Sequence, residues 1–245
     1  MCLEKLVHQN KEFAMTNPKA QWEKVTALNI DQNLKLGPIY SYFLLKDPKC
    51  FTFVLSRYKF ASKMLKNKKR IIEVGCGEGI GALMLAGETN AQVVGYDFDE
   101  SQITYARENL LIPFEEQNPH DRGRLSYEAR DFSKDGEAKS AFDGLVCLDV
   151  IEHLPRGEEE LAFLINCRGC LKEGGVAIIG TPSLHASDYA SERSQIGHIN
   201  LFSPDRLVPT LENHFSNVFM FSMNDEVVHT GFDKMAHYLI TLCVA

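Results

Sequence analysis

The sequence predicts an α/β protein with one mostly parallel sheet, covered on both faces and preceded by a helical region. Three observations support this class. Beyond residue 69, short apolar runs alternate with helical patterns, as in βαβ units. The first run leads directly into a glycine-rich turn, and the next runs end in acidic residues. The chain has 245 residues, 44% of them hydrophobic, so it can bury a large core in one such domain.

The first 66 residues contain no convincing strand. Their two or three helical patterns are interrupted at three proline-containing pairs, Asn17-Pro18, Gly37-Pro38 and Asp47-Pro48. We therefore expect an N-terminal helical cap over residues 1–66 and a sheet-containing core over residues 67–245.

Seven runs have the length and composition of strands, at residues 70–74, 92–96, 125–130, 144–149, 175–180, 217–223 and 235–244. The first five are apolar enough to be covered on both faces, which is typical of a parallel sheet. Helical patterns occupy residues 79–87, 101–110, 158–171 and 203–214; the last begins with a Ser-Pro pair that fits a helix start. The polar stretch 224–234 is long enough to let the last two strands pair antiparallel.

Charge and composition argue against several classes of protein. The formal net charge of −7 opposes nucleic-acid binding, and the local basic run at residues 63–70 is interpreted as a solvated helix end. No run approaches the roughly 20 apolar residues of a membrane span, and residues 1–5 lack a signal-peptide core. We therefore expect a cytoplasmic protein. Seven cysteines are expected to be reduced thiols, and the single CxxC pair, Cys167 and Cys170, favours helix packing over zinc.

The turn at residues 73–79 reads EVGCGEG and joins a strand to a helix. The missing side chains of Gly75, Gly77 and Gly79 let the backbone approach a ligand closely. The spacing is not the GxGxxG of a dinucleotide site, and the acidic Glu73 and Glu78 would repel a pyrophosphate. An acidic turn suits a ligand that carries an ammonium and a sulfonium.

Carboxylates follow the next two predicted strands. Asp97 ends the second strand, where it can bind a ribose diol, although it could instead cap the next helix. Phe98 would then pack on an adenine ring. Asp131 follows the third strand and could accept a hydrogen bond from the adenine amino group, or merely begin a turn. The fourth strand ends near Asp149, at the switch point where reactive chemistry is expected.

At these positions the sequence resembles the class I S-adenosylmethionine-dependent methyltransferases, in particular the small-molecule branch that includes ubiquinone-biosynthesis-type O-methyltransferases. The similar segments are residues 71–79 (IIEVGCGEG), 95–97 (GYD), 129–132 (ARDF), 142–154 (FDGLVCLDVIEHL) and 171–175 (LKEGG). The resemblance covers about residues 70–182. It implies a Rossmann-like seven-stranded sheet in the order 3-2-1-4-5-7-6, with strand 7 antiparallel.

The resemblance also implies roles for individual residues. Glu73 and the turn of Gly75, Cys76, Gly77 and Gly79 would face the methionine part of S-adenosyl-L-methionine, and the turn tolerates cysteine at Cys76. Asp97 would hold the ribose, Asp131 with Phe132 would contact adenine, and Leu148 and Asp149 would border the sulfonium. Separately, Arg57 and Tyr58 could reach the methionine carboxylate, or could belong to an ordinary amphipathic surface.

Histidines are the candidates for handling the acceptor proton, because their side chains titrate near pH 7. His198, in a loop after the fifth strand, is the leading base or acceptor-binding residue, and His229 is the second candidate. His153 is interpreted as structural. Glu152, His185, His198 and His229 could suggest a metal site, but nothing in the sequence brings their loops together, so we predict no metal.

The sequence therefore predicts a methyltransferase that uses S-adenosyl-L-methionine, releases S-adenosyl-L-homocysteine, and acts on a small organic acceptor at oxygen. Four aromatic residues of the cap are expected to help enclose the acceptor: Trp22, Tyr40, Tyr42 and Phe43. The alternatives are methylation at nitrogen, a non-catalytic module that binds the same cofactor, and a nicotinamide-dependent oxidoreductase. No nucleic-acid partner is expected, and the chain could be a monomer or a homodimer.

Overall fold

The computed structural model describes residues 17–28, 34–135 and 139–245. The chain divides into two units, Met1–Leu34 and Lys35–Ala245. In the first unit, helix α1 (Pro18–Thr26) begins after Asn17, whose side chain accepts a hydrogen bond from the Lys19 amide at 3.0 Å. Trp22 is 65% exposed.

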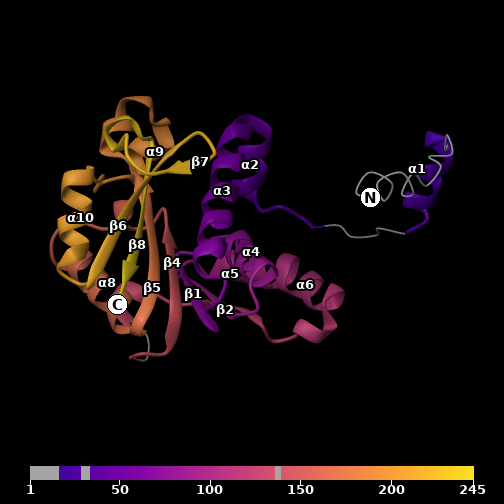
Figure 1. Ribbon diagram of the computed structural model, residues 1–245, viewed down its shortest axis with the longest axis horizontal. Helices are drawn as coiled ribbons and strands as arrows, with labels where there is room; N and C mark the ends of the chain where they lie inside the picture. The colour runs from indigo at the N-terminus through magenta and orange to yellow at the C-terminus, as the bar shows by residue number, and fades with distance from the viewer. Residues whose placement is uncertain (1–16, 29–33, 136–138) are drawn as a thin grey trace, which may run out of the picture. The chain divides into compact units, whose positions relative to one another are not determined.

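The second unit contains an eight-stranded sheet in the order β3-β2-β1-β4-β5-β8-β6-β7 (Figure 1). The strands are β1 (Arg70–Val74), β2 (Gln92–Asp97), β3 (Leu125–Ala129), β4 (Phe142–Leu148), β5 (Leu171–Pro182), β6 (Asn217–Asn224), β7 (Val227–His229) and β8 (Tyr238–Val244). The first five pair in parallel, and β8 pairs antiparallel with both β5 and β6. The predicted order of seven strands is confirmed, with β8 as the predicted seventh strand.

The eighth strand, β7, is a correction to the prediction. Residues 224–234 were expected to be a polar connection, but Val227–His229 turn back and pair antiparallel with the end of β6, from Ser222 to Asn224. The strand is only three residues long and has no alternating pattern long enough to recognise in the sequence.

Helices cover both faces of the sheet, as the apolar strands require. Buried side chains of α8 (Glu158–Gly169) and α10 (Pro204–Glu212) pack on one face, and those of α3 (Pro48–Met64), α4 (Ile80–Glu88) and α5 (Glu100–Ala106) pack on the other. Figure 1 shows the two groups on opposite sides of the strands. Shorter elements complete the unit: α7 (Phe132–Asp135), α9 (Glu192–Gly197), and the 3₁₀ turns η2 (Pro119–Asp121), η3 (Ile151–His153), η4 (Leu184–Tyr189) and η5 (Asp233–Met235).

The predicted cap boundary at residue 66 does not coincide with the division of the chain. Helices α2 (Pro38–Lys46) and α3 belong to the sheet-containing unit, because Tyr58, Ala61 and Leu65 of this region are buried in its core. Of the aromatic residues expected around a pocket, Tyr40 is buried against Phe43, whereas Tyr42 is 53% exposed.

The predicted helix at residues 101–110 continues farther than expected. After α5 the backbone passes through a π-helical turn, η1 (Arg107–Leu111), into α6 (Ile112–Gln117). Pro113 is the second residue of α6 and has no N–H, so it donates no backbone hydrogen bond where the π-helical turn passes into α6. No helix among the described residues is long and apolar enough to cross a membrane.

Candidate active site at the carboxyl edge of the sheet

The glycine turn after β1 has a backbone that only glycine adopts easily. Gly75, Gly77 and Gly79 have φ values of 76°, 52° and 89°, in the left-handed region. A Cβ on Gly75 would lie 2.2 Å from a methyl carbon of Val150, so the neighbouring loop leaves no room for a side chain. The Tyr96 carbonyl accepts hydrogen bonds from the Gly75 and Cys76 amides at 2.8 and 2.9 Å, which ties the turn to β2.

Asp97, at the end of β2, fixes the same turn from the other side. Its carboxylate accepts hydrogen bonds from the Gly77 amide at 2.8 Å and the Asp99 amide at 3.0 Å. The following helix is capped by Asp99, which accepts from the Ser101 amide at 2.9 Å, so Asp97 is not the helix cap that the sequence left open. Asp97 is 8% exposed at the edge of the sheet.

Glu73, in β1, is a fully buried carboxyl group. Burial raises its pKa to about 8, and the nearby Asp97 charge adds to the rise. The Tyr58 hydroxyl and the Ala82 amide oppose this shift, but neither Glu73 oxygen has a hydrogen bond of good geometry in the described structure. A Cβ on Gly81 would lie 2.1 Å from a Glu73 oxygen, so the carboxyl group packs directly under the start of α4.

Two other side chains of the turn point away from any ligand. Glu78 is buried and accepts hydrogen bonds from the amides of Ile39 at 2.7 Å and Tyr40 at 3.2 Å, so it caps α2. The Cys76 thiol is buried, which raises its pKa well above the ordinary value and keeps it neutral. A cofactor can therefore contact Cys76 only through its backbone.

The candidates for adenine contact are in three different environments. Phe98 is 80% exposed beyond the end of β2. The Asp131 carboxylate accepts a hydrogen bond from the Ser133 amide at 3.2 Å and forms an ion pair with Lys134 at 2.7 Å. Asp131 therefore begins a local turn, which was the alternative to adenine binding. The Phe132 ring is buried between Tyr96 and Phe163, so its side chain belongs to the core and only its backbone reaches the edge.

Asp149 lies directly after β4 and joins three elements. Its φ is +58°, unusual for a residue other than glycine, and its amide donates to the Gly180 carbonyl and to the Tyr238 hydroxyl at 3.1 and 3.2 Å. Arg57 of α3 donates to the Asp149 carboxylate at 2.7 Å and stacks 3.6 Å above the Tyr238 ring. Leu148 is buried beside them. Arg57 is therefore not part of an ordinary surface.

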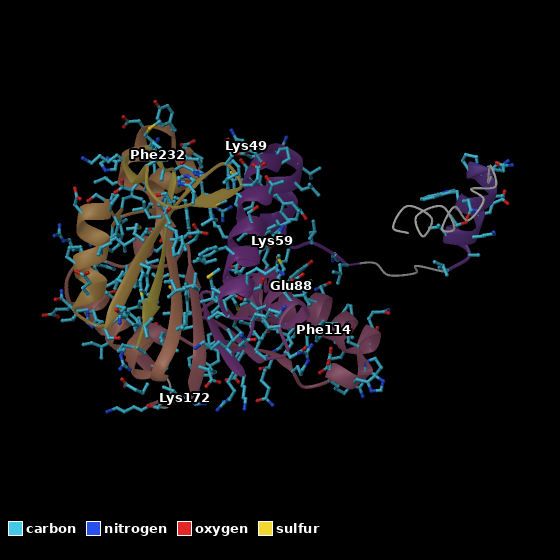
Figure 2. The ribbon with its side chains drawn as sticks, in the orientation of Figure 1. Lys49, Lys59, Glu88, Phe114, Lys172 and Phe232 are labelled. Carbon is cyan, nitrogen blue, oxygen red and sulfur yellow. The ribbon has the colours of Figure 1, made fainter. Side chains whose placement is uncertain are left out.

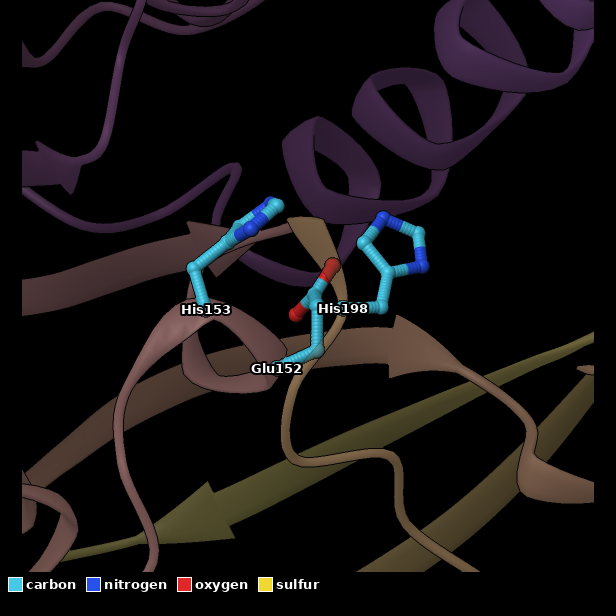
Figure 3. A group of neighbouring side chains, drawn as sticks. All are labelled: Glu152, His153 and His198. Atoms are coloured by element: carbon cyan, nitrogen blue, oxygen red, sulfur yellow. The ribbon is translucent and has the colours of Figure 1, made fainter. Parts of the chain in front are cut away.

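Glu152, His153 and His198 come together just beyond the end of β4. Among the described residues, these three form a group whose potential metal-ligand atoms all lie within 4.8 Å of one another. Figure 3 shows the Glu152 carboxyl group between the two imidazoles. The ring centroids of His153 and His198 are 5.1 Å apart. Neither His185 nor His229, which the sequence considered beside them, belongs to this group.

Each member of this group has a defined environment. Glu152 accepts from the Thr181 hydroxyl at 3.1 Å, while its Oε1 has no partner among the described residues; burial and the Asp149 charge raise its pKa to about 8. The Nδ1 of His153 must donate to the Gly197 carbonyl at 2.8 Å, which leaves Nε2 as an acceptor. Burial lowers the pKa of His198, as does His153, which favours a neutral ring.

The loop carrying His198 is anchored on both sides. The Asn200 side chain is buried and donates to the Glu160 carboxylate of α8 at 2.6 Å, and its backbone N–H donates to the Glu152 carbonyl at 3.0 Å. Arg206 of α10 pairs with the same Glu160 carboxylate and stacks 3.8 Å above Phe202. These contacts place His198 beside β4, although it follows His153 by 45 positions in the sequence.

His229 lies in a different part of the same edge. It ends β7, and its Nε2 is 2.9 Å from the Asn224 side-chain oxygen. It lines a cavity of about 380 Å³ with Asn224, Thr230, Phe232 and Met235.

Two supporting residues of the site leave no signal in the sequence. Tyr238 touches Arg57 and Asp149, yet it reads in the sequence as an ordinary apolar strand position. Thr181, which orients Glu152, carries no recognisable motif.

The parallel sheet with its reversed final strands, the left-handed glycine turn and the acid ending β2 define the class of S-adenosylmethionine-dependent methyltransferases with a Rossmann-like fold. A family model for the methyltransferase domain matches residues 49–214, which is more than half of the chain. The chain belongs to this family, whose methyl donor in this class is S-adenosyl-L-methionine.

Curated relatives match about half of the chain. A ubiquinone biosynthesis O-methyltransferase of Stutzerimonas stutzeri is 31% identical over 122 residues, which are 50% of this chain and 48% of the relative. The enzyme of the same name from Vibrio cholerae is 29% identical over 122 residues, or 49% of this chain and 45% of the relative. The chain thus spans about half the length of the curated relatives it matches.

Solved structures share the fold over a larger part of the chain. A Thermotoga maritima protein described as a possible histamine N-methyltransferase has a TM-score of 0.61 and 18% identity, covering 83% of this chain and 92% of its own. An N-methyltransferase of Bradyrhizobium japonicum, solved with S-adenosyl-L-homocysteine, has a TM-score of 0.57 and 16% identity, with 82% and 90% coverage. At these identities the likeness shows the fold alone.

Proposed function

We propose that this protein transfers the methyl group of S-adenosyl-L-methionine to an oxygen of a small organic acceptor. The observation that carries the proposal is the position of two features at one edge of the sheet. The glycine turn follows β1, and the group of Glu152, His153 and His198 follows the neighbouring strand β4. A donor held at the turn therefore has ionisable groups beside it, where an acceptor would be deprotonated.

In this proposal the donor lies across the turn. The Gly75–Gly79 backbone and Glu73 receive the methionine part, Asp97 the ribose, and Phe98 with Asp131 the adenine. Asp149 and Leu148 border the sulfonium. The Arg57 guanidinium already pairs with Asp149, so it would bind the methionine carboxylate by dividing its N–H groups between the two carboxylates.

His198 is the proposed base. Its lowered pKa keeps the ring neutral near pH 7, so the ring can accept a proton from an acceptor hydroxyl as the methyl group is transferred. Methyl transfer itself is an in-line displacement: the acceptor oxygen forms a bond to the methyl carbon as the sulfonium–methyl bond breaks. The electron pair of that bond returns to sulfur, and S-adenosyl-L-homocysteine is released.

The same three side chains favour a second role, as ligands of a divalent cation. The unpartnered Glu152 oxygen and the His153 Nε2 fixed by the Gly197 carbonyl are the atoms such a cation would use. The expectation that no metal binds stays a prediction. Activity measured after removal of metals by a chelator, and after adding back Mg²⁺, Mn²⁺ or Zn²⁺, decides between the two roles.

The test of the proposed function is a screen of small acceptors with isotope-labelled donor, read by mass spectrometry. We expect a labelled methyl ether as the product, and fragmentation distinguishes it from an N-methyl product. Binding of S-adenosyl-L-homocysteine without transfer to any acceptor, with and without added cations, would favour the non-catalytic module. Tight NADH binding without S-adenosyl-L-homocysteine binding would overturn the proposal. The cytoplasmic location and the oligomeric state stay predictions.

A further inference from the structure

The cavity beside β7 is separate from the Glu152 group but lies toward the same end of the sheet. Its lining consists of Asn224, His229, Thr230, Phe232 and Met235, from the end of β6, the end of β7 and the turn that follows. Figure 2 shows Phe232 at the end of the sheet-containing unit opposite Lys172, the second residue of β5. The cavity is therefore near the carboxyl ends of the parallel strands.

Most of the surface that lines the cavity is apolar, although three of the five residues have a polar group. The lining carries no formal charge when the histidine is neutral. Phe232 and Met235 are each 75% exposed, which is unusual for such large apolar side chains at the mouth of a cavity. Its volume of about 380 Å³ falls within the range of sites for small molecules. No lysine or arginine is among these lining residues to receive an anion, and the sequence neighbours Asp225 and Asp233 carry one more charge than the adjacent Lys234 offsets.

The hydrogen bonds around His229 fix which ring nitrogen carries the proton. The Asn224 amide nitrogen donates to the Met235 carbonyl at 2.9 Å, so the other end of that amide, facing His229, is the oxygen. This oxygen accepts from the His229 Nε2 at 2.9 Å, so Nε2 holds the hydrogen. The neutral ring is left with Nδ1 as an acceptor, and this nitrogen has no partner in the described part of the chain. Neighbouring atoms shield it almost completely, so a ligand in the cavity reaches it only when the side chains that cover it move aside.

The backbone beside the cavity is held in a costly conformation. Phe232 has a φ of +55°, in the left-handed region that a bulky residue rarely adopts. Such a conformation is energetically unfavourable and is typically kept where a side chain has a function. The ring of Phe232 stands edge-on to His229, with centroids 6.3 Å apart.

We infer that this cavity binds a neutral, mostly apolar small molecule through one hydroxyl or N–H group, which donates to the His229 Nδ1. Phe232 and Met235 cover the apolar body of the ligand, and Asn224 sets the tautomer that makes His229 an acceptor. The inference rests on the proposed function only in identifying this ligand with the methyl acceptor. Binding itself requires neither the donor nor methyl transfer.

The test uses three benzene derivatives: benzyl alcohol, which has a donor; benzyl methyl ether, which is one carbon larger and has none; and benzoate, which is an anion. Protein labelled with ¹³C at the methionine methyl groups reports binding, and Met235→Leu assigns the Met235 signal. We expect benzyl alcohol to shift this signal saturably and to bind about fivefold more tightly than the ether, the effect of one hydrogen bond. Benzoate should not bind. The Met84 signal, from a separate groove on α4, should not move.

Two variants at one position separate the hydrogen bond from the fold. His229→Gln can still donate to Asn224 but loses the acceptor at Nδ1, so the preference for the alcohol should disappear. His229→Asn keeps an acceptor near Nδ1 and loses the contact to Asn224, so part of the preference should remain. Equal binding of alcohol and ether by the unaltered protein, or an unchanged preference in His229→Gln, would overturn the inference. Methyl transfer by the same sample tests the proposed function separately.

Discussion

The proposed site has a methyl-donor end, formed by the glycine turn and Asp97, and a methyl-acceptor end, formed by the Glu152 group and the cavity at His229. The two ends differ in how the hydrogen-bonding needs of their polar atoms are met. At the donor end, backbone bonds to Tyr96 and the Asp97 carboxylate close the glycine turn without a ligand. At the acceptor end, two buried side-chain atoms have no partner among the described residues, Glu152 Oε1 and His229 Nδ1. An unpartnered buried polar atom costs about 1–3 kcal/mol.

The backbone of the donor turn is therefore preformed, whereas the acceptor groups keep polar atoms that a ligand would complete. The side chains around the donor turn do not share this feature of its backbone: both Glu73 oxygens, Gln102 Oε1 beside Gly77, and Arg57 Nε are also buried without a partner among the described residues. The predictions below test whether the two ends can be disturbed separately.

The largest effect is expected at the acceptor end. His198→Ala should lower turnover by about 10²–10⁴-fold, because the proposed proton acceptor is lost. The affinity for S-adenosyl-L-homocysteine, measured by calorimetry, should change by less than about threefold, because the donor turn is untouched. His185→Ala is the matched control, since His185 lies outside the group. Full turnover in His198→Ala would remove this residue from the chemistry.

A second substitution should disturb the donor end through the backbone. Gly75→Ala should lower the free energy of unfolding by about 2 kcal/mol or more, because it combines a positive φ with a contact to Val150 of 2.2 Å. Gly87→Ala, in α4, is the control: no atom lies within 4 Å of the added Cβ, so the variant should be neutral or slightly more stable. Urea unfolding measures both. Equal stability of the two variants would show that the turn is not rigid.

Asp97→Ala should weaken S-adenosyl-L-homocysteine binding by about 10²-fold, because it removes both the ribose ligand and the support of the Gly77 amide. Asp131→Ala should cost about tenfold or less, because one hydrogen bond to adenine is at stake. Calorimetry compares the two. An Asp97→Ala variant with unchanged affinity would contradict the ribose assignment.

The smallest effect concerns a proton. Because the Glu73 pKa is about 8, the group is mostly protonated at pH 7, and a ligand ammonium beside it should release up to about one proton. Calorimetry in buffers of different ionisation enthalpy measures this release. Glu73→Gln should abolish it; release that persists would assign the proton to another group, such as Glu152.

The same shift affects stability, since the folded state holds this proton up to about pH 8 and the unfolded chain loses it near the ordinary value of 4.5. The folded state binds more protons between these values, so the stability contribution of Glu73 is lost as the pH rises from 4.5 to 8. The stability of Glu73→Gln relative to the unaltered protein should therefore increase over this range.

The sequence predicted the donor end better than the acceptor end for a physical reason. Gly75, Gly79 and Asp97 act through backbone geometry within a strand, a turn and a helix, which leaves a local pattern. The sheet order of seven strands likewise followed from apolar runs and from the family resemblance. Residues without such a pattern, such as Tyr238, were missed.

The acceptor end is assembled from side chains far apart in sequence. The sequence indicates a structural role for His153 and a separate role as base for His198, because it does not show the contacts that join their loops: His153 to the Gly197 carbonyl and the Asn200 backbone amide to the Glu152 carbonyl. The short strand β7 was missed because three residues carry no periodicity. The role of Glu78 in capping α2 depends on a contact 39 residues away, which no local pattern reveals.

The place of β8 in the sheet has a consequence for folding. This strand lies between β5 and β6 although it follows both in the sequence, so β6 and β7 have no neighbour in the main sheet until residues 238–244 are in place. Pairing over such sequence separations is slow, and the open edges of β5 and β6 are meanwhile exposed to other chains. During synthesis the protein would therefore complete its sheet late, and substitutions in β8 should lower the yield of folded protein.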